Sequence, residues 1–372
     1  MTVNTTSTFA LFQQLLCPPG DGVYTVNTAK ERKLLLREQL YGKGVEAREA
    51  WLASMSQLAQ RSDQAVMLGV SSDCGGGILR GANWGPLFLR LALLEANAPV
   101  YPADLGDVRV IPHLLHDKYL NNDTIANCRR ALYGDAADQQ PVSPLSITEL
   151  VCDLFYQTYP TKGIFGIGGD HSVSYPLTRS YLRARKAKGI RTAIIHFDAH
   201  TDLLVERLGI DLCFGSWCTH ILQDLPAPSH LIQLGIRSSG KAKAHWEQTF
   251  GVKQYWADDI RMQGASQVAA EIIEQLKQQQ VDELYVSFDI DALDATIASA
   301  TGTPEPDGMT LEQAQQIINA LAAEFPIAAA DMMEIAPFTD SSGLGAISTK
   351  TTLDAAAALS LQLLNAINMP KK

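Results

Sequence analysis

The sequence predicts an α/β fold built on a parallel sheet that helices cover on both faces. Short apolar runs recur along the chain and end in Gly, Asp or Ser, which is typical of strands buried on both faces. Amphipathic segments of helical length separate these runs, as in a series of strand–helix–strand units. Apolar residues make up 46% of the 372 residues, so the chain is long and apolar enough to form a large core.

The predicted strands and helices alternate from about residue 64. Strands are expected at 64–71, 163–170, 192–200, 230–237, 283–291 and 327–335. Helices are expected at 86–97, 174–189, 265–280, 310–325 and 349–366. A polar stretch and a helical pattern broken near Gly42 precede them, so we expect a partly helical N-terminal extension over 1–60 and a main domain over 61–372.

Composition excludes several classes of partner. The formal net charge of −10 disfavours binding to nucleic acid or to an anionic membrane surface, and it is compatible with a small cationic substrate. Six cysteines occur without a CxxC pair, which predicts free thiols in a reducing compartment. No apolar run reaches the length of a membrane span, so we expect a cytoplasmic protein.

Three of the predicted strand ends carry acidic residues and histidines. The first is "GIGGDHS", with Asp170 and His171; the second is "FDAHTD", which ends at Asp202; the third is "YVSFDIDALD", which ends at Asp294. In an extended chain, alternate residues point to one face, so the D-x-H-x-D and D-x-D spacings can aim their side chains at one point. Ligands of open parallel sheets bind outside the carboxyl ends of the strands, where these residues occur.

The simplest explanation for so many buried carboxylates is a pair of divalent cations. A single Asp or His at a strand end is most often a cap or a solvated loop residue, but six on three strand ends are not explained in that way. Four aspartates in one pocket are costly unless cations neutralise them. Carboxylates and imidazoles without Cys suit manganese, and six donors suit two ions that share bridging carboxylates and activate a water. The candidate ligands are His171, Asp198, His200, Asp202, Asp289 and Asp291. His196 lies deeper in its strand, so we expect it to be a hydrogen-bonded histidine behind the ligands.

These motifs resemble the ureohydrolase family, which comprises arginase, agmatinase, guanidinobutyrase and formimidoylglutamase. The similarity covers roughly 64–366 and lies in "GVSSDCGGGILRGANWGPLFLR", "GGDHS", "FDAHTD", "SFDIDALDAT", "TGTPEPDGMT" and "DMMEIAP". The resemblance implies a three-layer α/β/α sandwich around a mainly parallel eight-stranded sheet. It also implies two metal ions per subunit, manganese first and nickel as an alternative, in a homotrimer or homohexamer.

The resemblance also implies roles for individual residues. Bridging aspartates would be Asp198 and either Asp289 or Asp291, and Glu334 would grip the guanidinium of the substrate. Asp202 or a neighbouring water would return the proton to the leaving amine. Thr303 matches a position beside the substrate, and Asp294 lies outside the ligand set as a structural cap.

Several positions depart from the arginase pattern. Leu204 replaces the Asn, and Ser238 the Asp, that hold the amino-acid end of arginine, which favours agmatine or 4-guanidinobutyrate as substrate. Phe214 stands where many members have a substrate-binding His, and His220 could replace that His only if its loop folds back. Phe214 and Trp217 either wall an apolar pocket for an uncharged substrate tail or belong to the core.

Three hypotheses follow from these observations. The first is a binuclear metal hydrolase that cleaves a linear guanidine or amidine, with release of urea from a guanidino substrate; formimidoylglutamate, which would release formamide, and free guanidine are further candidate substrates. The second is a hydrolase of another amide on the same fold, which would hold one zinc ion. The third is a non-catalytic paralogue that acts as an assembly or binding partner, because the motif histidine is missing and an extra N-terminal segment is present.

Overall fold

A single mixed sheet forms the centre of the molecule. The computed structural model describes residues 5–23, 27–77, 79–96, 101–134, 139–339 and 346–369. Within these residues the sheet has nine strands in the order β1-β3-β2-β4-β9-β8-β5-β6-β7. The strands are β1 Leu16–Cys17, β2 Ala65–Gly69, β3 Ala103–Val108, β4 Gly163–Ile167, β5 Thr192–Phe197, β6 Leu231–Leu234, β7 Lys253–Tyr255, β8 Glu283–Asp289 and β9 Ile327–Met333.

Among the described strands, the eight from β2 to β9 run parallel, and the two-residue β1 pairs antiparallel with β3. Every residue of β2, β4, β5, β6, β8 and β9 is buried, as expected for strands covered on both faces. All six strands predicted from the sequence are present. The sheet confirms the predicted eight parallel strands and adds β1 at its edge.

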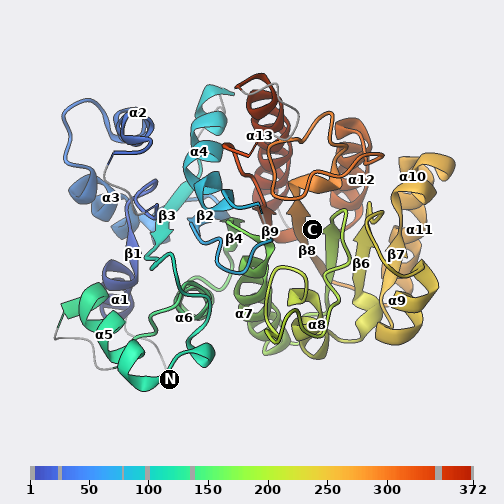
Figure 1. The fold of residues 1–372 in the computed structure, drawn as a ribbon, viewed down its shortest axis with the longest axis horizontal. Coiled ribbons are helices and arrows are strands. Elements are labelled where there is room, and N and C mark those ends of the chain that lie inside the picture. Colours follow the sequence, from blue (N-terminus) through green and yellow to red (C-terminus); the bar gives the residue numbers. More distant parts are fainter. Residues whose placement is uncertain are drawn as a thin grey trace.

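Helices form a layer on each face of the sheet (Figure 1). On one face α4, α13, α12 and α11 pack in sequence, and on the other α1, α6, α7 and α8 do so. The predicted three-layer sandwich is therefore confirmed. The helices are α1 Thr5–Leu15, α2 Lys30–Tyr41, α3 Ala47–Ser56, α4 Gly85–Glu95, α5 Asn122–Tyr133, α6 Pro144–Thr158, α7 Ser174–Lys186, α8 Trp217–Ile221, α9 Lys243–Phe250, α10 Ala257–Gln263, α11 Ala265–Gln278, α12 Leu311–Glu324 and α13 Ala346–Asn368.

Helix α12 illustrates why the predicted helices form. Thr310 accepts the N–H of Gln313 and the Gln313 side chain accepts the N–H of Thr310, a reciprocal cap that satisfies two backbone donors. The buried residues of α12 recur at helical spacing and face the sheet: Ala314, Ile317, Ile318 and Leu321. The capping residues and the spacing of the buried residues therefore both favour a helix at α12.

The N-terminal residues join the edge of the sheet. Helices α1, α2 and α3 precede the first long strand, and β1 extends the sheet beyond β3. The buried carboxylate of Asp107 accepts the N–H groups of Gly20 and Gly22 and pairs with Arg90 of α4. Among the described helices, none is long and apolar enough to cross a membrane.

Candidate metal centre

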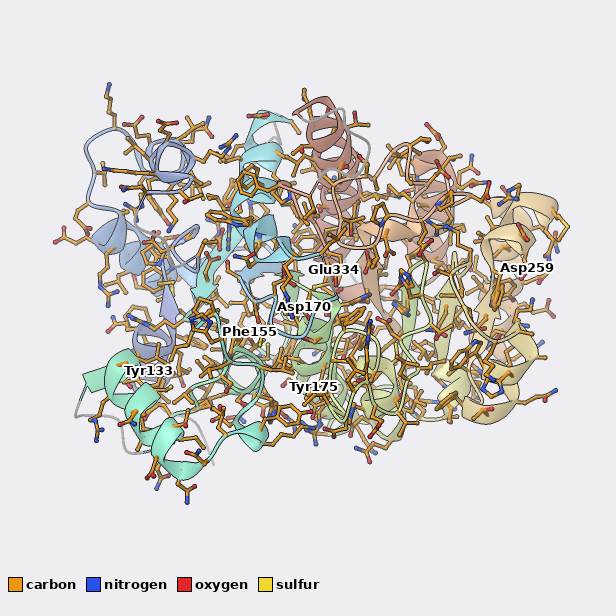
Figure 2. The ribbon with its side chains drawn as sticks, in the orientation of Figure 1. Tyr133, Phe155, Asp170, Tyr175, Asp259 and Glu334 are labelled. Carbon is orange, nitrogen blue, oxygen red and sulfur yellow. The ribbon has the colours of Figure 1, made fainter. Side chains whose placement is uncertain are left out.

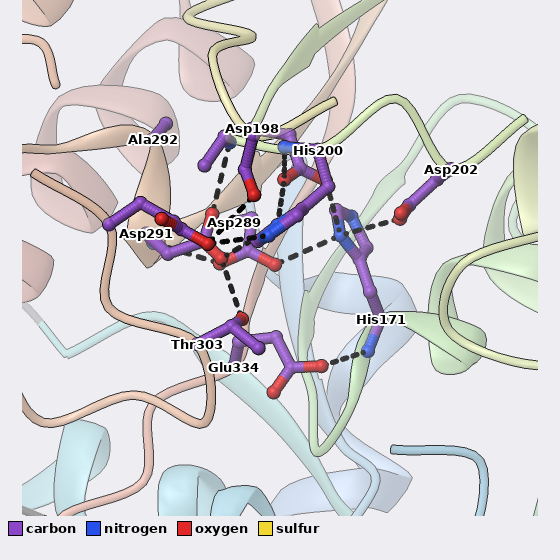
Figure 3. A network of polar contacts seen from close by, with 12 residues as sticks. His171, Asp198, His200, Asp202, Asp289, Asp291, Ala292, Thr303 and Glu334 are labelled. Carbon is purple, nitrogen blue, oxygen red and sulfur yellow. Dashed lines mark hydrogen bonds and ion pairs between the residues drawn. The ribbon is translucent and has the colours of Figure 1, made fainter. Parts of the chain in front are cut away.

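Four neighbouring strands end at one edge of the sheet and bring the predicted site residues together. In the order β4-β9-β8-β5, these strands are followed or ended by His171, Glu334, Asp289 and Asp198. Figure 2 shows Asp170 and Glu334 side by side near the middle of the molecule. Figure 3 shows all six predicted ligands and Glu334 around one space, so the sequence spacing does correspond to a single cluster.

The first part of the cluster surrounds the imidazole of His171. Its Nδ1 atom lies 3.1 Å from an oxygen of Asp198, 3.1 Å from Asp289 and 3.3 Å from Asp202. This nitrogen is buried and has the geometry of a hydrogen bond to no described residue. A ring nitrogen that faces three carboxylate oxygens without a hydrogen bond is the arrangement that a divalent cation between them would satisfy.

The second part of the cluster surrounds His200. Its Nδ1 atom lies 3.3 Å from Asp198 Oδ1 and 3.1 Å from Asp291 Oδ2. Asp198 uses its other oxygen toward His171, so it lies between the two histidines. The donor atoms therefore form two groups with Asp198 in common, as two ions bridged by a carboxylate would require.

Electrostatics indicate an excess of negative charge at the cluster. Burial and neighbouring carboxylates raise the pKa of Asp202, Asp289 and Glu334 well above ordinary values. Burial also acts to raise the pKa of Asp198, but the three neighbouring histidines outweigh it and hold that pKa well below its ordinary value. Carboxylates that resist ionisation in one pocket favour a bound cation, which would neutralise them.

Residues behind the ligands fix their orientation. His196 Nε2 lies 2.9 Å from Asp198 Oδ2, and the Gln233 side chain contacts the other ring nitrogen of His196. The role expected for His196 thus fits its position. His171 Nε2 lies 3.1 Å from Ser287 Oγ, and Ser287 donates to the buried Asp331. Sequence reasoning missed Ser287, although it precedes Asp289 by two residues and so shares its face of β8.

Trp217 belongs to the core and to the support of the ligands. It is fully buried, and its indole Nε1 donates to Asp202 Oδ2 at 2.8 Å. The sequence left Trp217 open between a pocket wall and the core, and the structure places it in the core. No spacing in the sequence indicated its hydrogen bond to Asp202, because α8 approaches from the loop after β5.

Two acidic residues of the site have left-handed backbone. The φ angles of Asp202 and Glu334 are 50° and 63°, values that non-glycine residues adopt at a cost of about 1 kcal/mol or more. Glu334 Oε1 accepts the N–H of His171 at 3.0 Å, which couples the end of β9 to the end of β4. Such a conformation persists where neighbours hold it, and the bond keeps the Glu334 carboxylate beside His171 (Figure 3).

Of the other residues predicted to contact the substrate, some lie at the cluster and one does not. Thr303 lies at the cluster, where its hydroxyl donates to Asp291 Oδ2 at 2.9 Å. Ser238 donates to Glu305, whose carboxylate lies 3.4 Å from His200 Nε2. His220 contacts the carbonyl oxygen of Asp211, and no interaction in the described structure joins it to the cluster, so its role in substrate binding stays a prediction.

Asp294 lies outside the ligand groups. Its carboxylate accepts the N–H and hydroxyl of Thr296 and the N–H of Gly308. These bonds tie together the two ends of the segment that joins β8 to α12, as expected for a structural cap.

The comparisons with known proteins point to one family. A model of the arginase family matches residues 63–365. The chain is 31% identical to "Agmatinase, mitochondrial" of Gallus gallus over 80% of this chain and 82% of that protein. It is 29% identical to "Guanidino acid hydrolase, mitochondrial" of Homo sapiens over 80% and 79%. The solved structure of formimidoylglutamase from Bacillus subtilis has the same fold, with a TM-score of 0.64, 22% identity and coverage of 82% of this chain and 88% of that one.

Proposed function

Because the chain belongs to the arginase family, we propose that it hydrolyses a small linear guanidino compound at a C–N bond and releases urea. Family membership confirms the resemblance seen in the sequence and the prediction of an amidinohydrolase. The observation that carries the proposal is the convergence of six potential metal ligands and Glu334 on the ends of four adjacent strands.

The donor set fits two divalent cations, with manganese as the first candidate and nickel as the second. His171, Asp198, Asp202 and Asp289 would hold one ion, and Asp198, His200 and Asp291 the other. A metal pair at this cluster supplies Lewis acidity, which lowers the pKa of water toward neutrality.

The remaining chemistry belongs to the side chains of this chain. The Glu334 carboxylate would hold the planar guanidinium through paired hydrogen bonds and turn its central carbon toward the cluster. The N–H of His171 occupies Glu334 Oε1 and so fixes the plane of that carboxylate. Asp202, which Trp217 orients, is the residue that would carry a proton to the leaving amine.

Two contacts support a substrate other than arginine. The Ser238 hydroxyl already donates to Glu305, and Leu204 has no polar group. Neither side chain is therefore available to bind the α-amino or α-carboxylate group of arginine. A site that leaves such charged groups unpaired discriminates strongly against them. We therefore place agmatine and 4-guanidinobutyrate above arginine, and the names of the two relatives agree with this order.

A metal-reconstituted activity screen tests the proposal. Chelator-treated protein is loaded with Mn²⁺ or Ni²⁺, then incubated with agmatine, 4-guanidinobutyrate, guanidine, arginine and formimidoylglutamate while urea and formamide are measured. We expect urea from agmatine or 4-guanidinobutyrate at a higher kcat/KM than from arginine. Asp198→Ala should abolish release, and Asp354→Ala, an exposed carboxylate on α13, should leave it unchanged.

Other outcomes would select the alternatives. Formamide release would identify a formimidoylglutamase, and urea from guanidine alone a guanidine hydrolase. Tight binding of a guanidino compound without turnover in protein that holds two metals per chain would favour the non-catalytic paralogue. One ion per chain would favour the zinc-dependent amide hydrolases of similar fold.

A further inference from the structure

A hairpin after β5 carries an exposed arginine, Arg207. The N–H of Leu204 donates to the carbonyl of Gly215 at 3.0 Å, and Arg207 and Ile210 exchange backbone hydrogen bonds of 2.8 Å and 3.0 Å. Leu208 takes a left-handed conformation between them, with a φ of 54°. The backbone of Arg207 is thus held in place although its side chain is exposed.

An aromatic ring holds the Arg207 guanidinium. Its central carbon lies 4.9 Å from the ring centroid of Phe214, within the range of a cation–π contact. The N–H of Phe214 donates to the carbonyl of Gly75 at 3.0 Å, so the ring is anchored to the loop after β2. Across the described ranges, no carboxylate forms an ion pair with Arg207, and its charge is available to a ligand.

The ring of Phe214 and the methyl group of Thr303 both lie close to Gly77. A β-carbon built on Gly77 would lie 3.7 Å from Phe214 Cζ and 3.9 Å from the methyl carbon of Thr303. The hydroxyl of Thr303 donates to Asp291, which is fully buried. Gly77 is therefore close both to the ring that holds the exposed Arg207 and to the residue that donates to the buried Asp291.

We propose that Arg207 selects substrates whose tail ends in a carboxylate, a selection that rests on the proposed guanidino hydrolase activity. With its guanidinium at Glu334, a linear substrate would direct its tail toward Phe214 and Arg207, because the Gly77 loop lies close to both Phe214 and Thr303. A carboxylate there gains charge-assisted hydrogen bonds to the Arg207 fork, whereas the ammonium of a diamine-like substrate is repelled.

The sequence left open an apolar pocket for an uncharged substrate tail, whereas selection by Arg207 favours a tail that ends in a carboxylate. Trp217 is fully buried against Asp202 and cannot wall a tail pocket. Phe214 remains half-buried, and the guanidinium of Arg207 covers its ring. Phe214 is then a positioning residue, and Arg207 is the specificity-determining residue. Among guanidino compounds, guanidino acids therefore rank above agmatine.

Steady-state kinetics with matched substrates test the assignment. Urea release by the Mn²⁺-loaded protein is measured with 4-guanidinobutyrate, agmatine and the neutral propylguanidine. For Arg207→Gln we expect kcat/KM for 4-guanidinobutyrate to fall about fivefold through KM, the upper end of the range for an exposed charge pair. The values for propylguanidine should not change, and those for agmatine should not fall.

Two controls separate charge from general disturbance. Arg48→Gln removes another arginine that lies over an aromatic ring, that of Trp51 in the N-terminal region. This variant should leave kcat/KM unchanged for all three substrates. Added salt should lower the ratio of kcat/KM for 4-guanidinobutyrate to that for propylguanidine in the wild type, because it screens the charge of Arg207. The same ratio should not change with salt in Arg207→Gln.

The outcomes distinguish this inference from the function on which it rests. If the wild type releases urea but Arg207→Gln keeps the same ratio between acid and neutral substrates, the role of Arg207 is overturned and the proposed function stands. If the wild type prefers agmatine to the acid, the selection is likewise wrong. If no guanidino compound yields urea, the proposed function falls and the selection falls with it.

Discussion

At the scale of single residues, side chains that never face the substrate determine where the candidate ligands lie. Trp217 donates to Asp202, and His196 contacts Asp198, both within the buried interior. Partners of this kind tune metal affinity about 10- to 100-fold in metalloproteins. Asp202 therefore depends on a residue of α8, and Asp198 on the histidine two residues before it at the end of β5.

We expect Trp217→Phe to lower Mn²⁺ affinity about tenfold, because it removes the donor to Asp202 and keeps an aromatic ring in the core. Titration calorimetry of the metal-free protein measures this directly. Trp246→Phe is the matched control, since Trp246 Nε1 donates to Ser239 outside the cluster. Equal losses in both variants would show that the effect is general loss of stability.

Glu334→Gln should separate substrate binding from metal binding. The substitution keeps the size of the side chain and the acceptor for His171 N–H, but it removes the charge that pairs with a guanidinium. We expect kcat/KM to fall about 100-fold or more, as for a buried charge pair that has lost one partner, while two metals per chain remain by elemental analysis. Loss of metal from this variant would instead make Glu334 part of the metal centre.

The sequence predicted the members of the cluster better than their geometry. The alternate spacing of Asp198, His200 and Asp202 suggested an extended chain, but β5 ends at Phe197 and Asp202 has a φ of 50°. A turn therefore brings Asp202 to His171. The periodic pattern identified the residues because they cluster at strand ends, but the turn depends on contacts with α8 that no local pattern records.

At the scale of elements, burial rather than propensity explains the strands that were missed. Strand β3 reads ADLGDV, in which two aspartates and a glycine obscure the apolar pattern. Arg90 of α4 pairs with both aspartates, so their charge is compensated inside the fold. Arg90 lies more than ten residues before both aspartates in the sequence, so no local pattern revealed these ion pairs. β7 has only three residues, too few for a periodic signal.

The turn after β4 depends on a glycine. A β-carbon at Gly169 would lie 1.5 Å from the carbonyl oxygen of Ser72, a clash with backbone that no rotamer change relieves. We expect Gly169→Ala to lower the free energy of unfolding by about 3 kcal/mol or more and to weaken metal binding, because Asp170 and His171 follow directly. Urea denaturation measures the loss. Gly240→Ala, with open space around its β-carbon, should change stability by less than about 0.5 kcal/mol.

At the scale of the whole molecule, the N-terminal residues and the catalytic sheet are connected. Helices α2 and α3 lie where the helical pattern broken near Gly42 predicted them, whereas α1 lies in the preceding stretch that was expected to be polar with turns. β1 and the Asp107 contacts tie this region to the edge of the sheet. The boundary at residue 60 and the assembly into trimers or hexamers stay predictions. The alternation of strands and helices was readable because each element follows a local period, whereas the attachment of an extension depends on distant partners.

Metal binding should also govern the stability of the molecule as a whole. The chain has a net charge of −10, and Asp289 has its pKa raised because it is buried beside other carboxylates. A cation that binds only the folded state stabilises it by about 2.7 kcal/mol at 100 times its Kd, so Mn²⁺ should raise Tm in scanning calorimetry.

Asp289→Asn keeps the acceptor for the N–H of Asp291 but removes one repelling charge. We therefore expect this variant to match or exceed the wild type in Tm without metal and to fall below it with Mn²⁺. A variant that is less stable in both conditions by the same amount would mean that Asp289 acts in packing and not through a bound cation.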